Sequence, residues 1–245
     1  MSQAKENAAS AALEYVQDGM TLGLGSGSTA EIFIEMLGEK VAGGMKIQGI
    51  PTSDATAACA RENGVPLIEA VRVSRIHLTI DGADEVDPAF NLIKGGGACL
   101  LREKIIAHAS DKMVVIVDDS KMVETLGAFA LPVEVDPFGM AITAEQIYDA
   151  LKASGCKNAQ TTLRQNKEGT GPLITDGGHY ILDCKCEVIP SPVDTALRLS
   201  QIPGVMEHGL FIDIADVIVI GESDHAKVME PVSYTHLTLP TILLV

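Results

Sequence analysis

The stretch Met113-Val-Val-Ile-Val117 decides the fold, because every one of its residues is apolar. A strand that is apolar on both faces is typical of the centre of a parallel sheet that helices cover on both sides. The segment just before it, residues 98–109, has the spacing of a helix. This order predicts a helix that leads into a central parallel strand.

Short apolar segments and helical segments alternate along the chain before this strand. Strands are expected at 21–25, 46–50, 66–68 and 76–80, and helices at 3–18, 30–37 and 52–61. This alternation predicts an α/β fold, with a Rossmann-like doubly wound sheet, over residues 1–130. The segment at 215–220 is expected to return to that sheet, so that residues 206–228 complete the domain.

The pattern changes at Leu131-Pro-Val-Glu-Val135, after which glycine-rich turns separate successive strands. Strands are expected at 131–135, 161–164, 173–174 and 180–183, and helices at 144–154 and 193–199. This order predicts a smaller inserted α+β domain of the ferredoxin-like kind over residues 131–205. The last segment, 229–245, has two prolines and an apolar end, and we expect a non-native or disordered extension rather than a docking segment.

Charge and composition argue against several classes of partner. The formal net charge is −15, no basic run occurs, and aromatic residues make up only 4% of the chain. Nucleic acids and membrane surfaces are bound by clustered Lys and Arg, so we expect neither as a partner. No apolar run of about 18 residues could span a membrane, and the first residues lack the apolar core of a signal peptide. Five cysteines without a CxxC motif are typical of reduced thiols, so we expect a cytoplasmic protein.

The first motif with chemistry is the glycine-rich segment Gly23-Leu-Gly25-Ser-Gly27-Ser28-Thr29. It follows an expected strand and opens an expected helix, so its N–H groups and hydroxyls converge on the positive end of that helix. Ser28 stands where the dinucleotide fingerprint GxGxxG has its third glycine, and no GK[ST] of a Walker A loop occurs. The segment predicts a cradle for a phosphate or hydroxyl group, and a plain tight turn is the alternative.

A cluster of acids, Asp81-Gly82-Ala83-Asp84-Glu85, follows the strand expected at 76–80. Ligands of open α/β sheets gather at the carboxyl ends of the strands, so these acids lie where chemistry is expected. A solvated turn and a magnesium site are the alternatives, but the six histidines are scattered and no DxD pair occurs. The roles that remain are recognition of hydroxyl groups and transfer of protons.

Two lysines also follow apolar segments of the chain. Lys94 precedes Gly95, Gly96 and Gly97, which allow a ligand to approach the backbone closely, and Lys121 ends a DDSK segment. The two lysines would supply local positive charge in an acidic protein, and exposed solubilising lysines are the alternative.

Glu103 lies on the helix that follows Lys94 and the glycines. Its spacing alone favours a salt bridge on the helix surface. Leu100 and Ile106, three residues away on either side, give it a half-apolar setting that would raise its pKa and suit a general base. The sequence by itself leaves both roles open.

In combination, these segments resemble the A-type ribose-5-phosphate isomerases over roughly residues 3–228. The matching segments are GSGST (25–29), TSDAT (52–56), DGADE (81–85), KGGGACLLREKI (94–105), DDSK (118–121), LPVEV (131–135) and LFIDIADVIVIG (210–221). The family's usual GTGST threonine is Ser26 here, which keeps the hydroxyl group, and residues 231–245 have no counterpart in the family's usual ending. The resemblance implies interconversion of D-ribose 5-phosphate and D-ribulose 5-phosphate in the non-oxidative branch of the pentose phosphate pathway.

The resemblance also implies roles for single residues. Glu103 would be the catalytic base that moves a proton between C2 and C1 through an enediolate, and Lys94 would stabilise the enediolate charge. Asp81, with Asp84 beside it, would assist ring opening and shuttle the hydroxyl proton. The implied substrate-binding residues are Ser26, Gly27, Ser28, Thr29, Asp81, Gly82, Ala83, Asp84, Lys94, Gly95, Gly96, Gly97, Lys121 and Lys5. Such an enzyme would bind a small sugar phosphate, need no cofactor or metal, and form a homodimer or homotetramer.

Two rival functions belong to related folds. One is a sugar-phosphate-sensing module that binds its ligand without turnover, and the intact Glu103, Asp81 and Lys94 argue against it. The other is a CoA transferase or an amino-sugar-phosphate deaminase, and the KGGG…REK segment argues against both.

Overall fold

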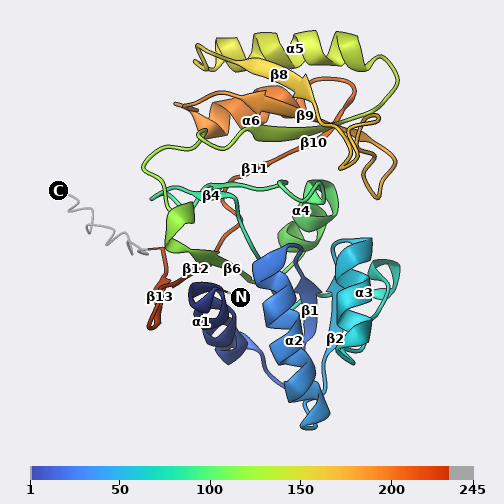
Figure 1. Ribbon diagram of the computed structural model, residues 1–245, viewed down its shortest axis with the longest axis vertical. Coiled ribbons are helices and arrows are strands. Elements are labelled where there is room, and N and C mark those ends of the chain that lie inside the picture. Colours follow the sequence, from blue (N-terminus) through green and yellow to red (C-terminus); the bar gives the residue numbers. More distant parts are fainter. Residues whose placement is uncertain (1, 232–245) are drawn as a thin grey trace, which may run out of the picture.

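The structure, a computed structural model, describes residues 2–231, and three β-sheets lie within that range. In Figure 1 the largest sheet and the N-terminal helices occupy the lower part of the view. The segments coloured yellow and orange form a second unit at the top. This arrangement confirms the predicted α/β fold with a smaller α+β unit.

The largest sheet has six strands in the order β13-β12-β6-β3-β1-β2. They are β1 (Thr21–Leu24), β2 (Gln48–Pro51), β3 (Leu78–Asp81), β6 (Met113–Asp118), β12 (Val217–Gly221) and β13 (Ala226–Met229). Neighbouring strands are parallel, except that β13 is antiparallel to β12. The helices of this part are α1 (Gln3–Ala12), α2 (Ser28–Ala42), α3 (Asp54–Glu62) and α4 (Leu100–His108). The expected return to the first sheet is confirmed, because β12 lies beside β6.

The apolar run in β6 is buried on both faces of the sheet, as its sequence predicts. Val114 and Ile116 join a core cluster with residues of α1 and α2, whereas Val115 and Val117 join a cluster that includes Phe211. Successive side chains of a strand point to opposite faces, so both faces of the sheet are covered. Burial of each Val or Ile side chain contributes about 1.5–3 kcal/mol, which makes β6 the apolar centre of the sheet.

The strand order reverses beside β1. From β1 the chain crosses to β2 on one side, and β3, β6 and β12 are added on the other side. A reversal of this kind leaves a crevice at the carboxyl ends of the strands. The glycine-rich motif follows β1 and the acidic motif follows β3, so the two motifs meet at that crevice.

The second sheet is antiparallel, with the order β10-β7-β9-β8. Its elements are β7 (Leu131–Val135), α5 (Met140–Ala153), β8 (Gln160–Leu163), β9 (Tyr180–Lys185), α6 (Pro192–Ser200) and β10 (Val205–His208). The chain order β-α-β-β-α-β is that of a ferredoxin-like unit, as predicted. The sheet extends past the boundary expected at 205, because Glu207 and His208 still pair with β7.

A third sheet of three short strands joins the two units and has no counterpart in the sequence prediction. It contains β4 (Glu85–Val86), β5 (Leu92–Ile93) and β11 (Leu210–Phe211). Lys94 follows β5, and its backbone N–H donates to the Gly209 carbonyl at 2.8 Å. The Gly209 N–H in turn donates to the Pro132 carbonyl at 2.7 Å, so this sheet ties Lys94 to the first strand of the smaller unit.

Several expected elements differ from the structure. Residues 66–68 form a single bridge beside β2 instead of a strand, because Pro66 has no N–H to donate. Residues 173–174 lie outside the small sheet, beside a bridge at Pro172, where proline again removes a donor. The helix expected at 3–18 ends at Ala12 and continues only as a 3-10 turn to Tyr15.

None of the helices within residues 2–231 is long and apolar enough to cross a membrane. The extension expected at 229–245 overlaps the structure at Met229, which ends β13. Residues 232–245 lie outside the described residues.

Candidate active site

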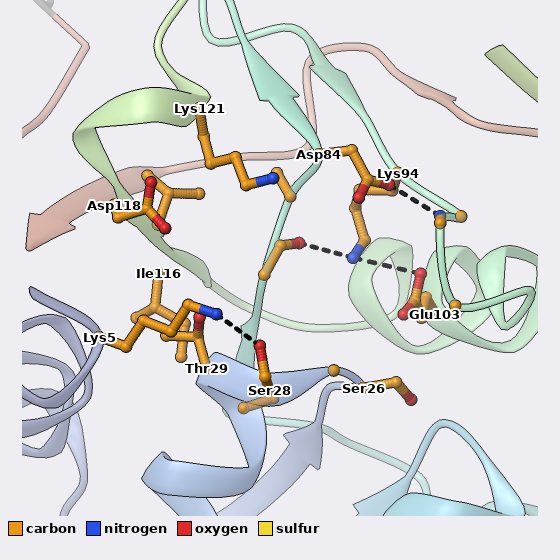
Figure 2. A pocket seen from close by; sticks show the side chains of 18 residues that line it. Lys5, Ser26, Ser28, Thr29, Asp84, Lys94, Glu103, Ile116, Asp118 and Lys121 are labelled. Carbon is orange, nitrogen blue, oxygen red and sulfur yellow. Dashed lines mark hydrogen bonds and ion pairs between the residues drawn. The ribbon is translucent and has the colours of Figure 1, made fainter. Parts of the chain in front are cut away.

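A cavity of about 200 Å³ opens at the carboxyl ends of β1, β3 and β6. Figure 2 shows the side chains that line it. The lining residues are Lys5, Ser26, Gly27, Ser28, Thr29, Ala30, Gly82, Ala83, Asp84, Lys94, Gly95, Gly96, Gly97, Glu103, Ile116, Val117, Asp118 and Lys121. The structure therefore brings every site residue expected from the sequence to this cavity except Asp81, which is fully buried next to it.

One side of the cavity, which we call the open end, is formed by Lys5, Ser28, Thr29 and Lys121 (Figure 2). Helix α2 begins at Ser28, and Gly27 before it has φ 101°, a backbone conformation that favours glycine. The Lys5 ammonium donates to the Ser28 hydroxyl at 2.8 Å. Two ammonium groups and the positive end of a helix together make a site for an anion such as a phosphate.

The opposite side, which we call the buried end, contains Lys94, Asp81 and Glu103. Lys94 Nζ lies 3.0 Å from Asp81 Oδ2 and 3.2 Å from Glu103 Oε2, and the three side chains are 3%, 0% and 5% exposed. The surface salt bridge that spacing alone favours for Glu103 is therefore wrong. Its partner is Lys94, which directly follows β5 and contacts Glu103 from outside the helix. The spacing of residues along α4 could not reveal a partner from another part of the chain.

The Lys94 ammonium also donates a hydrogen bond to the Gly82 carbonyl, at 2.6 Å. The two carboxylate oxygens that face Lys94 lie at ion-pair distance from its ammonium group. Within residues 2–231, Asp81 Oδ2 and Glu103 Oε2 have no hydrogen-bond partner although both are buried. Both oxygens therefore keep free capacity to accept a proton, which is what proton transfer requires.

Burial dominates the acid–base properties of the buried end. It raises the pKa of Glu103 to about 8; the nearby Asp81 charge acts in the same direction, and the Lys94 ammonium opposes it. Burial also raises the pKa of Asp81, again against the effect of Lys94. The pKa of Lys94 is raised, because the charges of Asp81 and Glu103 outweigh its burial. Two acids thus share one ammonium group, and the arrangement favours a proton on one of the acids near neutral pH.

Gly25 allows the first glycine-rich loop to hold Asp81 in place. A Cβ atom at Gly25 would lie 2.1 Å from Asp81 Oδ1, so any other residue would displace the carboxylate. In this close approach the backbone N–H groups of Ser26 (3.1 Å) and Gly82 (2.7 Å) both donate to Asp81 Oδ1. The loop therefore fixes one Asp81 oxygen and leaves the other facing Lys94.

Comparison with known proteins places this site in a family. The family model for ribose 5-phosphate isomerase A (phosphoriboisomerase A) matches residues 48–225. The ribose-5-phosphate isomerase A of Maricaulis maris is 61% identical over 226 residues, which are 92% of this chain and 97% of that protein. This chain belongs to the ribose-5-phosphate isomerase A family. Another family member, from Bradyrhizobium diazoefficiens, is 51% identical over 94% of this chain and 96% of its own length.

Solved structures of ribose-5-phosphate isomerases have the same fold. The enzyme from Methanocaldococcus jannaschii superposes with a TM-score of 0.85 at 33% identity, covering 93% of this chain and 98% of that one. A D-ribose-5-phosphate isomerase in complex with phospho-erythronic acid superposes with a TM-score of 0.86 at 39% identity, with the same coverage. The isomerase fold therefore extends over both the parallel sheet and the smaller unit.

Within this isomerase fold, a cluster of hydroxyl groups supports the loop at Ser26. The Ser26 Oγ lies 2.9 Å from each of the side-chain oxygens of Thr52, Ser53 and Thr56. Ser53 also caps α3, since its hydroxyl accepts from the Thr56 N–H at 3.0 Å. The TSDAT segment was expected to start a helix and matches the family, but its contact with Ser26 could not be predicted, because that contact depends on how β1 and β2 pair.

Four lining residues of the isomerase cavity were absent from the sequence-based site. They are Ala30, Ile116, Val117 and Asp118. Asp118 ends β6 and belongs to the DDSK segment, so its position at the carboxyl end of a central strand was the signal that pointed to it. Ala30, Ile116 and Val117 are apolar and carry no comparable signal.

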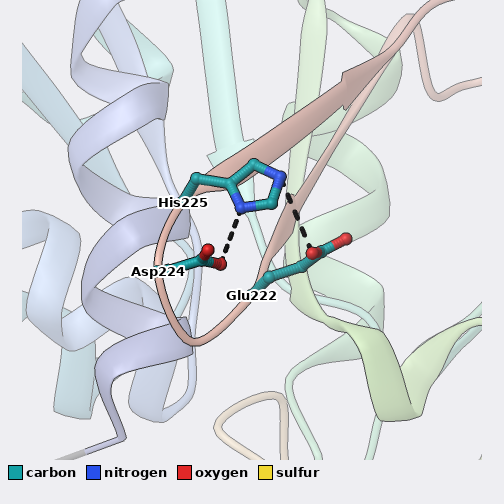
Figure 3. Close-up of side chains that lie close together, drawn as sticks. All are labelled: Glu222, Asp224 and His225. Atoms are coloured by element: carbon teal, nitrogen blue, oxygen red, sulfur yellow. Dashed lines mark hydrogen bonds and ion pairs between the residues drawn. The ribbon is translucent and has the colours of Figure 1, made fainter.

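One group within the described residues has side chains that could ligate a metal, and it lies outside the isomerase cavity. Glu222, Asp224 and His225 gather on the turn between β12 and β13 (Figure 3). His225 contacts Asp224 at 2.8 Å and Glu222 at 3.6 Å, and Asp224 and His225 are exposed. These contacts account for the cluster as a surface ion-pair network.

Proposed function

We propose that this chain catalyses the reversible interconversion of D-ribose 5-phosphate and D-ribulose 5-phosphate, as part of the pentose phosphate pathway. The observation that carries the proposal is the buried end of the cavity, where an acid with a pKa of about 8 lies beside an ammonium group. Aldose–ketose isomerisation needs a carboxylate that moves a carbon-bound proton and a cation near the oxygens that become negative. Membership of the family supports the same reaction.

The two ends of the cavity give the substrate one orientation. The phosphate lies at the open end, against Lys5, Lys121 and the start of α2, and C1 and C2 of the sugar reach the buried end. The phospho-erythronic acid bound by the solved relative joins a phosphate and a carboxylic acid through a short hydroxylated carbon chain. Such a ligand suits a cavity that has an anion site at one end and a site for reacting oxygens at the other.

Glu103 is the base in this mechanism. It takes the proton from C2 of the open-chain aldose, holds it while the enediolate exists, and returns it to C1, which gives the ketose. The negative charge that develops on the oxygens of C1 and C2 is stabilised by the Lys94 ammonium, which stays charged because its pKa is raised. Asp81 Oδ2, which has no hydrogen-bond partner within the described residues, carries the hydroxyl proton from the C2 oxygen to the C1 oxygen.

We propose Asp84 as the partner of Asp81 in ring opening, since its side chain lines the cavity. Its Oδ2 accepts the Gly96 N–H at 2.8 Å, which leaves Oδ1 for the ring oxygen or a hydroxyl of the sugar. Because Lys94 already supplies positive charge at the reacting oxygens, we propose that neither a metal nor a cofactor takes part. Full activity is expected after dialysis against EDTA, and activity that returns only with a divalent cation would contradict this proposal.

The experiment that tests the function is an assay of the purified chain with ribose 5-phosphate, in which formation of the ketose is followed by absorbance. We expect saturable turnover in both directions. The rival sensing module predicts that ribose 5-phosphate binds, as measured by calorimetry, while no ribulose 5-phosphate forms.

We further propose that the chain assembles as a homodimer or homotetramer in the cytoplasm, with no nucleic-acid or membrane partner, and that the smaller unit is a separate inserted domain. Large apolar side chains that are exposed within residues 2–231, such as Phe138 at 92% and Ile142 at 69%, support assembly. The net charge of −15 supports the lack of polyanionic partners. Light scattering on the purified chain measures the mass of the assembly, and a monomer would contradict the proposal.

A further inference from the structure

Arg164 reaches from the smaller unit to the second glycine-rich loop of the cavity. It follows β8, and its backbone is fixed on both sides: its N–H donates to Ile181 at 2.9 Å and its carbonyl accepts from Leu173 at 2.8 Å. Its Nη1 donates to the carbonyl oxygens of Gly95 at 2.9 Å and Gly96 at 3.1 Å. This one guanidinium nitrogen therefore holds two successive peptide groups of the loop.

Asp183 of β9 keeps the guanidinium in this position. Arg164 Nε donates to Asp183 Oδ2 at 2.9 Å, and Nη2 donates to Asp183 Oδ1 at 2.5 Å, which is a two-pronged pair. The Arg164 side chain is 15% exposed and that of Asp183 is 28% exposed. A partly buried guanidinium that is held by two hydrogen bonds has little conformational freedom. The position of the glycine-rich loop is therefore fixed relative to the small sheet.

The two captured carbonyls determine where the loop N–H groups point. In a trans peptide the C=O and the following N–H point in opposite directions. The Gly96 N–H, which follows the Gly95 carbonyl, accordingly points away from Arg164 and donates to Asp84 at 2.8 Å. The Gly97 N–H, which follows the Gly96 carbonyl, must also point away from Arg164, towards the side on which Asp84 lies.

The Gly97 N–H is available to a ligand. Gly97 lines the cavity and is exposed, and within residues 2–231 its N–H makes no hydrogen bond. Gly96 packs closely on Asp84, because a Cβ atom added there would lie 2.7 Å from Asp84 Oδ1. The loop is thus held between Arg164 on one side and Asp84 on the other, with a free N–H donor directed to the cavity.

We propose that Arg164 is a positioning residue of the isomerisation, an inference that rests on the proposed function. By holding the Gly95 and Gly96 carbonyls, Arg164 directs the Gly97 N–H at the sugar oxygen that becomes negative in the transition state. Lys94 then supplies the charge, and the Gly97 N–H supplies a second, fixed donor to that oxygen. The small unit contributes to catalysis through Arg164 although, among the described residues, none of its own residues lines the cavity.

The test compares Arg164→Met, Arg164→Lys and Arg198→Met with the parent protein. Arg198 is the matched control, because it also pairs with an aspartate of the small unit, Asp194 at 2.7 Å, but lies on α6. For Arg164→Met we expect kcat to fall on the order of 10- to 100-fold, with KM changed by less than about 3-fold, because the donor acts only in the transition state. Arg164→Lys should recover part of kcat, since an ammonium can still bind one carbonyl.

Ligand binding separates positioning from a general loss of structure. We expect Arg164→Met to bind inorganic phosphate as the parent does, because the open end is untouched, and to bind phospho-erythronic acid more weakly. Parent kcat in Arg164→Met, or an equal loss in Arg198→Met, would overturn the proposal. If Arg164→Met does not fold, Asp183→Asn should show a smaller loss in kcat, and parent kcat there would count equally against it. A parent protein without turnover of ribose 5-phosphate would instead refute the proposed function.

Discussion

The two ends of the cavity use the same kind of side chain in opposite surroundings. At the open end, Lys5 and Lys121 are partly exposed and stand beside hydroxyl groups and a helix N-terminus. At the buried end, Lys94 is 3% exposed and stands between two carboxylates. The open end can hold a charged group of the substrate at modest cost, because water and salt still screen it. At the buried end, desolvation disfavours every charged group. Whether a carboxyl group there holds or releases its proton therefore depends on the charges of the neighbouring groups.

This difference divides the work between binding and chemistry. A contact at the open end is the same in the ground state and the transition state, so losing it should raise KM. A group at the buried end acts on charge that exists only during the reaction, so losing it should lower kcat. If the two ends separate in this way, substitutions at the buried end should change kcat and substitutions at the open end should change KM.

The largest effect is expected from Glu103→Gln, which keeps the shape of the side chain and removes the carboxylate that we propose as the base. We expect kcat for ribose 5-phosphate to fall on the order of 10²–10⁴-fold or more, while the substrate still binds. Glu39→Gln, an exposed change on α2, is the matched control and should keep parent kinetics. Parent kcat in Glu103→Gln would rule out Glu103 as the base.

The next effect is the pH dependence of kcat/KM. Because the free protein holds a proton on Glu103 up to a pKa of about 8, the active carboxylate form increases as the pH rises. We expect kcat/KM to rise about 50-fold between pH 6 and pH 8 and then level off. Binding of inorganic phosphate across the same range is the control for ionisation of the phosphate group. A profile that is flat above pH 6 would show that the buried end does not raise the pKa of its base.

A smaller effect is expected from Lys121→Gln at the open end. Removing one charge-assisted contact to the phosphate should raise KM about tenfold and change kcat by less than about 3-fold. Added salt should raise the parent KM for the same reason, and by less in the variant. Lys40→Gln, an exposed change on α2, is the control. A fall in kcat with unchanged KM would mean that the two ends do not divide the work as described.

The smallest effect concerns stability. The folded protein holds the Glu103 proton up to about pH 8, whereas the unfolded chain releases it near 4.5. The parent therefore loses stability as the pH rises between these two values, and a glutamine has no proton to lose. We expect Glu103→Gln to melt at the parent temperature near pH 4 and a few degrees above it at pH 8. If parent and variant melt at the same temperature at both pH values, the buried proton is held by another group, for example by Asp81.

Local patterns were enough to predict the elements that have long or unusual sequence signals. The all-apolar run at 113–117 predicted the central strand, and the motifs after β1 and β3 predicted a ligand site at the strand ends. The two-residue strands β4, β5 and β11 could not be predicted, because two residues show no period. The isolated bridges at Leu67, next to Pro66, and at Pro172 show the opposite case. There an apolar segment was expected to form a strand, but a proline removes a backbone donor.

The candidate site shows the same division between local and long-range information. The glycines and acids could be recognised as ligand-binding types from their neighbours in the chain. The burial of Glu103 could not be predicted in this way, because it depends on contact between α4 and Lys94, which directly follows β5. Arg164 lay in a segment without any motif, and its contact with Gly95 and Gly96 joins residues that are far apart in the sequence. Such contacts follow from packing of the two units and leave no local pattern.

The insertion of the smaller unit between β6 and β12 also affects how the protein is made. These two strands are hydrogen-bonded neighbours, yet about a hundred residues separate them, which a ribosome adds in roughly 5–20 s. Until β12 emerges, β6 has an unpaired edge at the centre of the future sheet, and such an edge can pair with another chain. Helix α1, made first, packs on both β6 and β12, so it too lacks part of its partner surface until then. The nascent chain therefore carries an unpaired edge on a strongly apolar strand while the smaller unit is being synthesised.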